Sequence, residues 1–432
     1  MITTAHQGSS TPLKANRRLK VLLPTIGSAG DVHPVLALAI ALQRRGHRAT
    51  ILTNPFFAEL IDEHGVGFLP VGTVEDARAT IADPDLWHPR KGFEVIARRA
   101  ILPAMAEVYR QIERHADRDT IVAASGISFG ARIAQERLAV PTATLHLQPS
   151  IIRSLVDQGM AGSVRLSASQ PMWFKRAFFR LADWFLIDRA LKRPVNEFRA
   201  TLGLPPVDRL MHRWMHSPSL VIGFFPDWFA KPQSDWPPKT QLVGFPLWDS
   251  AATALPPEAG EFLEAGDPPI VFTPGSAGAT MHRFFEASVT AARELGVRSM
   301  LVTNFPEQVP TDLPPHVKTF GYLPFSDVLP HAAMLVYHGG IGTLAQTIKA
   351  GIPHLVVPSG HDQFDNAWRV EQLGLGRSIP QARYRADPVV ALIRAILADG
   401  GARARCRDYA SRIDSNAAIT RACELIEGLA SP

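Results

Sequence analysis

The sequence predicts an α/β protein of two facing Rossmann-like domains, each built on a doubly wound parallel sheet. Three observations lead to this prediction. The chain has 432 residues, more than the roughly 250 to 300 at which one hydrophobic core stops growing. Short apolar segments alternate with amphipathic helical segments, which is typical of parallel sheets. The alternation occurs in two series, and a Pro-rich passage separates them.

The first series follows a polar N-terminus that lacks the apolar core of a signal peptide. We expect residues 1–17 to form a loose tail and residues 18–235 to form the first domain. The segment LKVLLPT predicts a first strand, and the pattern after it predicts a helix from Val32 to Arg45 that ends at Gly46. A second strand, a second helix and a third strand follow.

The second series runs from residue 269 to residue 432. The apolar segments IVFT, SMLV and MLVY predict strands, and amphipathic segments between them predict helices. We interpret residues 236–268, which are rich in proline, as the linker between the domains. The last helices could return to the first domain.

An insertion, about residues 150–216, breaks the alternation in the first domain. Within it, residues 171–191 have the pattern of an amphipathic helix. The predicted apolar face carries Phe174, Phe178, Leu181 and Phe185, and the predicted polar face carries Lys175, Arg176, Arg180 and Asp183. Two interpretations are open: a helix packed on its own domain, or a basic-rimmed lid for a lipid acceptor or a bilayer surface.

The composition argues against several classes of protein. The net charge is +5, but no basic tract is interleaved with the spaced aromatic residues of a nucleic-acid groove. Cys406 and Cys423 have no second pair of cysteines, which argues against a disulfide framework and a zinc site. No apolar run approaches the ~18 to 20 residues of a membrane-spanning helix. We expect a cytoplasmic protein that contacts the inner membrane at most peripherally and has no nucleic-acid partner.

The first candidate site is the loop GSAGD, which follows the first predicted strand. The loop does not match GxGxxG, so dinucleotide binding is weakly supported. Gly27 and Gly30 place backbone without side chains at the carboxyl edge of the sheet, where open α/β sheets bind ligands. Asp31 could cap the following helix. It could equally act as a general base that takes a proton from an acceptor hydroxyl group.

The second candidate site is the segment HGGIGT, where a predicted strand runs into a predicted helix. The free N–H groups and the dipole of that helix favour a diphosphate near His338, Gly340, Gly342 and Thr343. The next strand leads into PSGHDQFDNA, which places Asp362 and Gln363 on the same edge. Their carboxylate and amide groups suit sugar hydroxyls, although Asp362 could instead cap a helix.

Two other motifs have simpler interpretations. GISFG, residues 126–130, matches the G-x-S-x-G nucleophile elbow of hydrolases, but no HGGG-type loop lies upstream of it. The acidic pairs DPD, residues 83–85, and DRD, residues 117–119, lie in polar stretches. We interpret these carboxylates as solvated loop acids rather than metal ligands.

The chain resembles the nucleotide-sugar glycosyltransferases of the GT-B fold, and HGGIGT with PSGHDQFDNA is similar to their donor-binding signature. The resemblance implies that the first domain holds the acceptor and the second holds the donor. Plant members place a catalytic histidine three residues before a proline in the first loop. Counted back from Pro34, that position is Asp31 here, with His33 as the second candidate base. Bacterial relatives with GSxGD loops look similar in using the aspartate itself.

The resemblance also assigns a set of donor-binding residues. Ser276 would touch phosphate, and Tyr322 and Leu323 would lie against the base of the nucleotide. The full implied set is Ser28, Gly30, Thr273, Ser276, Tyr322, Leu323, His338, Gly340, Gly342, Thr343, Asp362 and Gln363. It implies a nucleotide-sugar co-substrate, with no other cofactor and no metal.

Four segments resemble the rhamnosyltransferase family of bacterial rhamnolipid synthesis: residues 83–96, the Trp- and Pro-rich residues 214–237, residues 244–249 and residues 361–367. That family transfers L-rhamnose from dTDP-L-rhamnose to a 3-(3-hydroxyalkanoyloxy)alkanoic acid. The implied acceptor residues are Phe174, Phe178 and Phe185. The first alternative is transfer of glucose from UDP-glucose to a sterol, a macrolide or another lipophilic acceptor. More remote alternatives are a nucleotide-sugar epimerase and a lipid-binding protein without catalysis.

Overall fold

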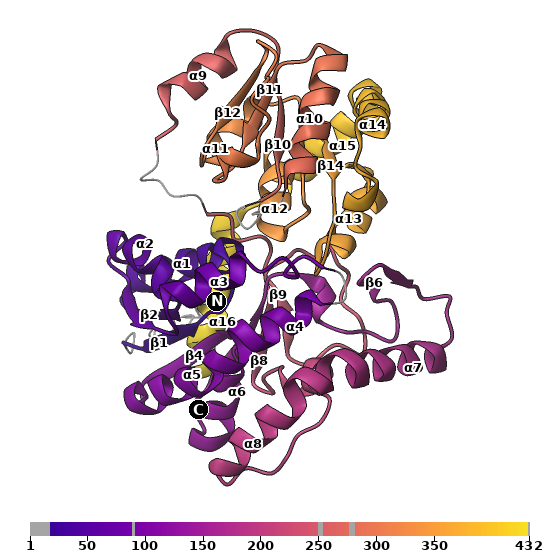
Figure 1. Ribbon diagram of the computed structural model, residues 1–432. Coiled ribbons are helices and arrows are strands. Elements are labelled where there is room, and N and C mark those ends of the chain that lie inside the picture. Colours follow the sequence, from indigo (N-terminus) through magenta and orange to yellow (C-terminus); the bar gives the residue numbers. More distant parts are fainter. Residues whose placement is uncertain (1–17, 89–90, 249–253, 276–280, 431–432) are drawn as a thin grey trace, which may run out of the picture.

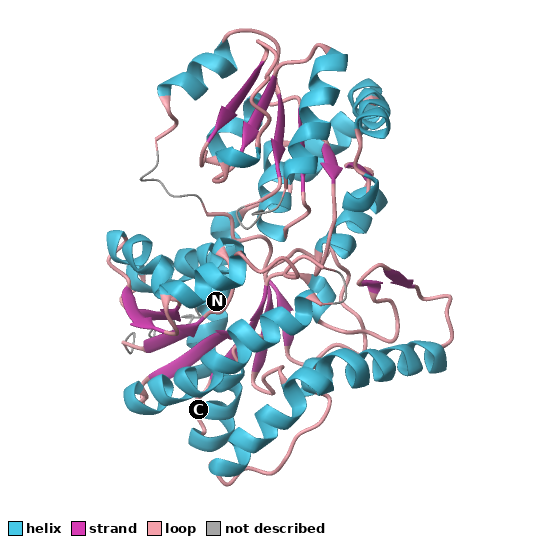
Figure 2. Ribbon diagram, viewed as in Figure 1, coloured by secondary structure: helices cyan, strands magenta, loops and turns pink. Residues whose placement is uncertain are grey.

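Two parallel sheets, one in each half of the chain, form the framework of the protein. The computed structural model describes residues 18–88, 91–248, 254–275 and 281–430. Figure 1 shows the second half of the chain above the first, with helices around both sheets. Figure 2 shows the same layers by secondary structure. The predicted fold class, two facing Rossmann-like sheets, is confirmed; the predicted tail, residues 1–17, lies outside the described residues.

The first sheet has seven strands in the order β3-β2-β1-β4-β5-β8-β9, and its neighbouring strands pair in parallel. The strands are β1 (Lys20–Pro24), β2 (Arg48–Thr53), β3 (Gly67–Pro70), β4 (Thr120–Ser125), β5 (Thr142–His146), β8 (Leu220–Gly223) and β9 (Thr240–Leu242). The helices before the insertion are α1 (Ala29–Arg44), α2 (Ala58–Glu63), α3 (Val74–Ile81), α4 (Gly92–Ile96), α5 (Leu102–His115) and α6 (Phe129–Leu138).

Both faces of this sheet are buried, which explains why its strands are nearly continuous apolar runs. Val21 and Leu23 point into a core that α1 shares. Leu22, between them, points to the opposite face and packs with residues of α5 and α6. The alternation of side chains along a strand thus lets one short segment contribute to two cores.

The second sheet has six strands in the order β12-β11-β10-β13-β14-β15, again paired in parallel. The strands are β10 (Ile270–Thr273), β11 (Ser299–Val302), β12 (Val317–Phe320), β13 (Met334–Tyr337), β14 (His354–Val356) and β15 (Gly376–Ser378). The helices are α9 (Pro257–Glu264), α10 (His282–Leu295), α11 (Phe325–Val328), α12 (Ile341–Ala350), α13 (Gln363–Gln372), α14 (Ala386–Ala398), α15 (Gly400–Ser411) and α16 (Ser415–Glu427).

The two sheets reverse their strand order at equivalent places. The reversal lies between β1 and β4 in the first sheet and between β10 and β13 in the second. Ligands of open α/β sheets bind outside the carboxyl ends of the strands at such a switch point. The loop after β1 carries Asp31, and the loop after β13 carries His338. The topology therefore places both candidate loops where a ligand is expected.

The last helix of the chain packs on the first sheet although it follows the second. Ala422, Cys423 and Ile426 of α16 share a core with residues of β1 and α1. Glu427 accepts a hydrogen bond from Arg45 Nε at 2.6 Å and pairs with His47 at 2.9 Å. The end of the chain thus links the two halves a second time.

Two predicted boundaries differ from the structure. The helix expected from Val32 starts at Ala29, because Ser28 takes the N-cap position and Asp31 falls in the first turn. The expected linker, residues 236–268, contains β9, which pairs with β8 as the edge strand of the first sheet. Three residues among prolines were too few to produce a strand pattern, since alternation needs about four or more residues to be recognised.

The insertion forms a hairpin followed by a long, irregular helix. The hairpin is β6 (Gly159–Ala161) with β7 (Val164–Leu166), and the helical part is α7 (Met172–Ala182), the π-helical segment η4 (Asp183–Lys192) and α8 (Arg193–Thr201).

Lys175 was assigned to the exposed polar face, and this assignment is wrong. Its side chain is buried, and Nζ donates to the carbonyl oxygens of Val156 at 2.6 Å and Ser167 at 3.1 Å.

Candidate active site

Asp31 lies in the first turn of α1 and is held there by the loop before it. Its carboxylate oxygen Oδ2 accepts hydrogen bonds from Ser28 N at 2.8 Å and from Ser28 Oγ at 3.2 Å. Gly27 adopts φ of 143°, and a Cβ atom at that position would lie 2.1 Å from Asp31 Oδ2. Two features of position 27 therefore require glycine: its positive φ, and the carboxylate that fills the space a Cβ atom would need.

The environment of Asp31 disfavours its charged form. Burial raises the pKa of Asp31 to about 6, and the two hydrogen bonds from Ser28 oppose this effect without cancelling it. One Oδ2 atom receives both bonds from Ser28. Because both bonds end on one carboxylate oxygen, the side chain can hold the start of the helix with that oxygen and accept a proton on the other.

His338 follows β13, and its imidazole ring packs between Gly275 and Gly340. A Cβ atom at Gly275 would be 2.6 Å from His338 Cε1, and one at Gly340 would be 2.4 Å from His338 Nε2. Burial lowers the pKa of His338 to about 4, so the imidazole is neutral at pH 7. Its Nδ1 atom is buried and has no hydrogen-bond partner among the described residues. The two glycines create the slot that the ring needs.

The N-terminus of α12 opens beside this histidine. Gly340 is the N-cap residue, and no side chain caps the helix there among the described residues. A Cβ atom at Gly342 would meet nothing within 4 Å. The first N–H groups of a helix have no partner within it and lie at the positive end of the helix dipole, which is the arrangement that binds phosphate groups.

Asp362 lies on the next loop of the second sheet, before α13. Its Oδ2 atom accepts a hydrogen bond from Asn366 Nδ2 at 2.7 Å. Burial, with a smaller contribution from the charges of Asp31 and Asp365, raises the pKa of Asp362 to about 7. The charge of Asp31 reaches Asp362, and α1, which carries Asp31, contacts α12, so the two candidate loops, one from each sheet, lie near one another.

Gln363 has a more structural role than the sequence indicated. Its Oε1 atom accepts hydrogen bonds from Ser359 N at 2.8 Å, Ser359 Oγ at 2.9 Å and Gly360 N at 3.2 Å. The side chain is buried. The oxygen therefore shapes the loop after β14.

Two sets of contacts join the halves of the chain around this site. His361 has φ of 53°, its Nε2 atom donates to the carbonyl oxygen of Leu86 at 2.9 Å, and its ring packs against Trp87. On the other side, Met160 N of the hairpin donates to Asp365 Oδ1 of α13 at 2.8 Å. Both contacts start from residues that flank Asp362, so they position the donor loop relative to the first sheet.

Comparisons with known proteins agree with this geometry. Residues 21–155 match the glycosyltransferase family 28 N-terminal domain, and residues 291–427 match the C-terminal domain of erythromycin biosynthesis protein CIII-like proteins. Each matched part contains one of the two facing loops. The chain is a glycosyltransferase of the GT-B fold.

Individual relatives cover nearly the whole glycosyltransferase. The O-mycaminosyltylonolide 6-deoxyallosyltransferase of Streptomyces fradiae is 28% identical over 95% of this chain and 97% of its own length. The structure of the glycotransferase of kitacinnamycin has a TM-score of 0.74 at 19% identity, over 96% of this chain and 100% of that one. The glycosyltransferase VinC in complex with dTDP has a TM-score of 0.65 at 18% identity, over 95% and 99%.

The remaining predicted donor-binding residues of the glycosyltransferase differ in burial and in the contacts they make. Thr273 Oγ1 accepts a hydrogen bond from Gly275 N at 3.2 Å, which shapes the loop after β10. Tyr322 is exposed, whereas the side chain of Leu323 is buried in the core of the second sheet. A direct contact between the nucleotide base and the Leu323 side chain is therefore not available in this arrangement. Ser276 lies outside the described residues.

His33, the second candidate base, lies apart from Asp31 on the same helix. Its ring packs edge-on against Trp248, with 4.8 Å between ring centroids. Residues two apart on a helix do not face each other.

Gly30 and Ser28 belong to the segment that holds Asp31, and Ser28 donates to the Asp31 carboxylate from both its backbone N–H and its hydroxyl group.

The three predicted acceptor residues do not gather in a cavity. Phe174 and Phe185 are exposed on α7 and η4, whereas Phe178 is partly buried. None of them lines either of the two cavities found in the described part of the chain. Figure 1 places α7 at the outer edge of the first domain. By contrast, α1, which carries Asp31, contacts α12, and Asn366 joins the loops of His338 and Asp362.

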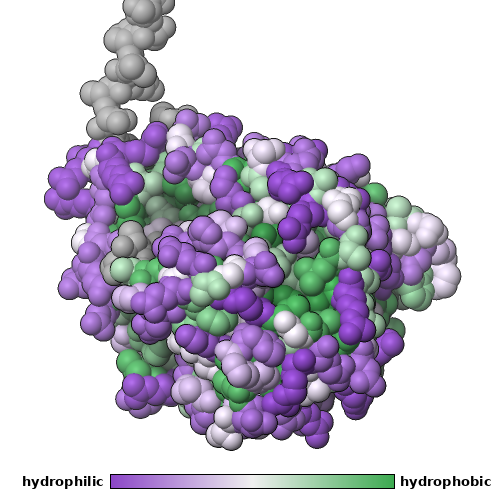
Figure 3. All heavy atoms as spheres, turned by 90° about the horizontal axis from the view of Figure 1, so that it is seen from above, coloured by the Kyte–Doolittle hydropathy of each residue, from purple (hydrophilic) through white to green (hydrophobic). Residues whose placement is uncertain are grey.

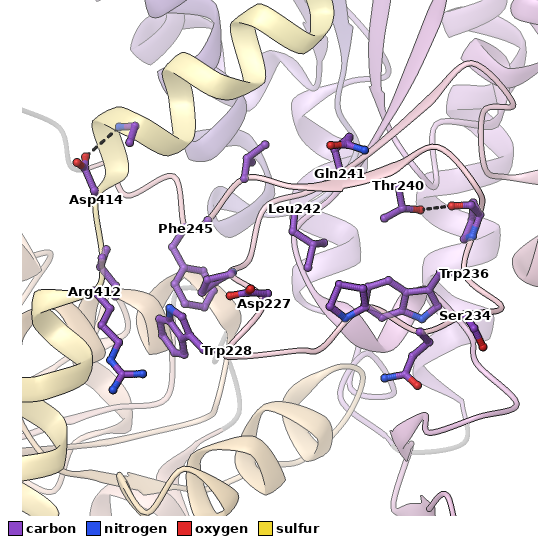
Figure 4. Close-up of a pocket in the computed structure, with 18 of the residues that line it drawn as sticks. Asp227, Trp228, Ser234, Trp236, Thr240, Gln241, Leu242, Phe245, Arg412 and Asp414 are labelled. Atoms are coloured by element: carbon purple, nitrogen blue, oxygen red, sulfur yellow. Dashed lines mark hydrogen bonds between the residues drawn. The ribbon is translucent and has the colours of Figure 1, made fainter.

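The larger cavity, of about 800 Å³, lies beside the passage that connects the sheets. Figure 4 shows Trp228, Trp236, Leu242 and Arg412 around it. None of the predicted site residues lines it. The smaller cavity contains His338 and Ser359 and therefore belongs to the donor site.

The alternative motifs have structural roles. Ser128 of GISFG is buried, and its Oγ atom lies 3.1 Å from Pro24 O and 2.8 Å from Ser125 Oγ. The acids Asp83 and Asp85 pair with Arg99 and Lys91. In the described ranges, no group of three or more His, Cys, Asp or Glu residues is arranged to hold a metal ion.

Asn366 and His361 are site residues that the sequence analysis missed. Asn366 is fully buried, and its Nδ2 atom donates to Gly339 O at 2.9 Å as well as to Asp362. It thereby joins the two donor loops. Its position four residues after Asp362 on one helix was an available signal. For His361 there was none, since Leu86 lies 275 residues away in the sequence.

Proposed function

We propose that this glycosyltransferase transfers L-rhamnose from dTDP-L-rhamnose to the hydroxyl group of a 3-(3-hydroxyalkanoyloxy)alkanoic acid, with inversion at the anomeric carbon. The observation that carries the transfer step is the position of Asp31. Its carboxylate, with a pKa of about 6, lies on α1, which contacts α12 of the second sheet, and its charge raises the pKa of Asp362. The product would be a mono-rhamnolipid.

In the proposed displacement, Asp31 accepts the proton of the acceptor hydroxyl group. The hydroxyl oxygen forms a bond to the anomeric carbon while the bond from that carbon to the diphosphate oxygen breaks. dTDP leaves with the electron pair of that bond. A general base works best when its pKa lies near the operating pH, and such catalysis typically contributes ~10² to 10⁴ in rate. A pKa of about 6 leaves Asp31 mostly ionised at pH 7 while keeping it a stronger base than an exposed aspartate.

The donor side of the proposal rests on His338 and α12. A neutral imidazole can donate one N–H group to a phosphate oxygen. Gly342 and Thr343 lie in the first turn of α12, where backbone N–H groups have no partner within the helix. Fixed donors of this kind stabilise charge that grows on a leaving group, because they need no reorganisation during the reaction. In this proposal they carry the diphosphate charge without a metal ion.

The choice of sugar and nucleotide follows from similarity. The relative from Streptomyces fradiae is described as transferring a 6-deoxyallosyl group, and L-rhamnose is also a 6-deoxyhexose. VinC is described in complex with dTDP, which makes a dTDP-sugar the first donor to test. Asp362 and the amide nitrogen of Gln363 are the groups proposed to bind the sugar hydroxyls.

The lipid acceptor is supported by the resemblance of the Trp- and Pro-rich passage to the rhamnosyltransferases of rhamnolipid synthesis. A second candidate acceptor is a molecule of the O-mycaminosyltylonolide type, which is favoured by the relative that matches 95% of the chain. The two candidates share the donor site and the base but differ in the hydroxyl compound that enters the cleft.

The test is an acceptor and donor panel. The protein is incubated with dTDP-L-rhamnose or UDP-glucose, each with the hydroxyacyl lipid, with O-mycaminosyltylonolide, or without acceptor. Nucleoside diphosphate release and product mass are measured. Release of dTDP only with the lipid, and a product carrying one deoxyhexose, would support the proposal. Transfer to the other acceptor alone would replace it, and sugar conversion without any acceptor would indicate an epimerase.

A further inference from the structure

The large exposed apolar side chains of this protein are concentrated on one helix. Seven of the twelve found in the described residues lie between residues 172 and 186, on α7 and the start of η4. Trp173 is 70% exposed, Trp184 66%, Phe185 61% and Leu181 53%. Scattered apolar residues are normal on a protein surface, whereas a contiguous group of them marks an interaction site. We refer to these four residues as the aromatic face.

The aromatic face points outward because the opposite side of the helix is anchored. Phe179, Ile187 and Leu191 are buried in the first domain. Lys175 is buried beside them with its ammonium group on two carbonyl oxygens, and Arg153 lies over the Phe179 ring at 4.9 Å. Burying a lysine is costly unless its charge is compensated. A helix that only completed a core would bury the tryptophans and expose the lysine, so this orientation presents the aromatic residues to something outside the chain.

The charges around the aromatic face are positive. Within residues 172–191, the exposed charged side chains are Arg176, Arg180 and Arg189. The acids of this segment are less accessible: Asp183 is paired with Arg153 at 2.5 Å, and Asp188 is partly buried. A partner of this surface therefore meets apolar side chains surrounded by cations, which complements an apolar interior beneath anionic groups.

The shape and composition of the surface fit a lipid bilayer. Trp173 and Trp184 are eleven residues apart, about three helical turns and ~16 Å along the axis. Arg176 and Arg180 lie between them in the sequence. Trp and Arg are the residues that favour the interface between lipid headgroups and acyl chains. In Figure 1, α7 projects at the edge of the molecule, where a flat surface can approach it.

The other five large exposed apolar side chains of the described residues are spread over the chain. In Figure 3, which views the molecule from above, hydrophilic residues cover much of the visible face and apolar residues gather in a hollow. No helix in the described part of the chain is long and apolar enough to cross a membrane. Contact through α7 would therefore be peripheral, with the helix lying in the plane of the interface.

We propose that the aromatic face of α7 and η4, together with Arg176, Arg180 and Arg189, docks the protein on the surface of a bilayer that contains anionic lipids. Trp173, Trp184 and Phe185 enter the region below the headgroups, and the arginines bind lipid phosphates. The docking surface is separate from Asp31 and His338. This inference does not depend on which acceptor the enzyme uses.

The test is co-sedimentation of the purified full chain with vesicles of phosphatidylglycerol and phosphatidylcholine, or of phosphatidylcholine alone. We expect binding to the anionic vesicles that weakens as salt increases, since salt screens the arginine charges. The double variant Trp173→Ser/Trp184→Ser should bind at least roughly tenfold more weakly, because burial of one large apolar side chain is worth about a factor of ten. The triple variant Arg176→Gln/Arg180→Gln/Arg189→Gln should lose the preference for anionic vesicles.

The matched control is Phe56→Ser, which removes an aromatic residue that is 51% exposed on another element. Its vesicle binding should equal that of the parent. Thermal unfolding of all variants should be unchanged, since each altered side chain is exposed. Failure of the parent to bind anionic vesicles would overturn the proposal, as would equal binding by the tryptophan variant. A dimer that depends on Trp173 and Trp184, without vesicle binding, would assign the surface to a second copy of the chain instead.

Discussion

The carboxylates of Asp31 and Asp362 interact across the two halves of the protein, and the charge of Asp31 raises the pKa of Asp362. Asp31 follows the first strand of one sheet, and Asp362 precedes α13 of the other. Burial raises the pKa of Asp31 to about 6 and is the main reason that the pKa of Asp362 is raised to about 7. Two interacting acids with raised pKa values are a frequent feature of catalytic sites.

Replacing Asp31 with asparagine should abolish most of the activity without removing donor binding. Asparagine keeps the size and hydrogen-bond acceptor of the side chain but cannot take a proton. The turnover number should fall by ~10² to 10⁴, while calorimetry should give an unchanged dissociation constant for the donor. Asp76→Asn is the matched control, because Asp76 caps α3 through the same contacts with Thr73 and lies on another helix. Turnover close to that of the parent would exclude Asp31 as the base.

The pH dependence of turnover should have an acid limb near pH 6. Asp31 must be ionised to accept a proton, so activity should fall about tenfold per pH unit below its pKa of about 6. Asp362 has the higher pKa, about 7, so it is mostly protonated at the pH where Asp31 titrates. Asp362→Asn should therefore leave the acid limb near pH 6 while the KM for the donor rises. An acid limb that moves clearly in this variant would contradict the assignment of the limb to Asp31.

Replacing Asp31 with asparagine should also stabilise the folded state at neutral pH. The folded-state pKa of about 6 lies above the ordinary aspartate value of 3.8, so ionisation between these two pH values costs the folded state free energy. The penalty is absent below about pH 4 and complete above about pH 6. Asp31→Asn should therefore be more stable than the parent by about 2 to 3 kcal/mol at pH 7 and similar to it at pH 4. Denaturant unfolding at both pH values measures this difference.

Gly340→Ala should weaken donor binding by displacing His338. The added Cβ atom would lie 2.4 Å from His338 Nε2, which requires the ring or the loop to move. Overpacking of this kind typically costs about 1 to 3 kcal/mol, so thermal stability should also fall in the absence of donor. The control is Gly400→Ala at the start of α15, where a Cβ atom meets nothing within 4 Å. Its donor affinity and stability should not decrease, and a similar loss in both variants would contradict the proposed slot.

Asp365→Ala should release the hairpin of β6 and β7 from α13. The substitution removes the acceptor of the Met160 N–H group and leaves Arg369 without its partner at 2.7 Å. Loss of such buried partners costs about 1 to 3 kcal/mol. Hydrogen exchange at Met160 should accelerate. Asp365→Asn, which retains an acceptor oxygen, should restore slow exchange at this amide, and identical rates in both variants would argue against this contact.

Much of the fold was predictable because it depends on local patterns. Continuous apolar runs followed by glycine-rich loops and amphipathic segments indicated both sheets, and the described strands confirm them. The short strand β9 was not predicted, since three residues among prolines carry no period, and α1 starts before the expected Val32, since Ser28 could be read as loop. The domain boundaries and the roles of the site residues stay predictions.

The orientation of α7 was not predictable for a different reason. Its sequence has an apolar and a polar face, and amphipathic periodicity alone implies that the apolar face is buried. In the structure, Lys175 is buried and Trp173 and Trp184 are exposed. The carbonyl groups of Val156 and Ser167, which compensate the lysine, come from the preceding hairpin region. Periodicity carries no information about such partners.

By itself, the sequence determined the class of fold, the two glycine-rich loops and the residue types able to move a proton and bind a diphosphate, because each is set by neighbours within a few positions. Only the tertiary structure decided that Asp31 faces Asp362, that Gly275 and Gly340 enclose His338, and that Asn366 joins the donor loops. These relations join residues from separate strands, and burial among them sets the pKa values. The chemistry of the site therefore depends on distances that only folding creates.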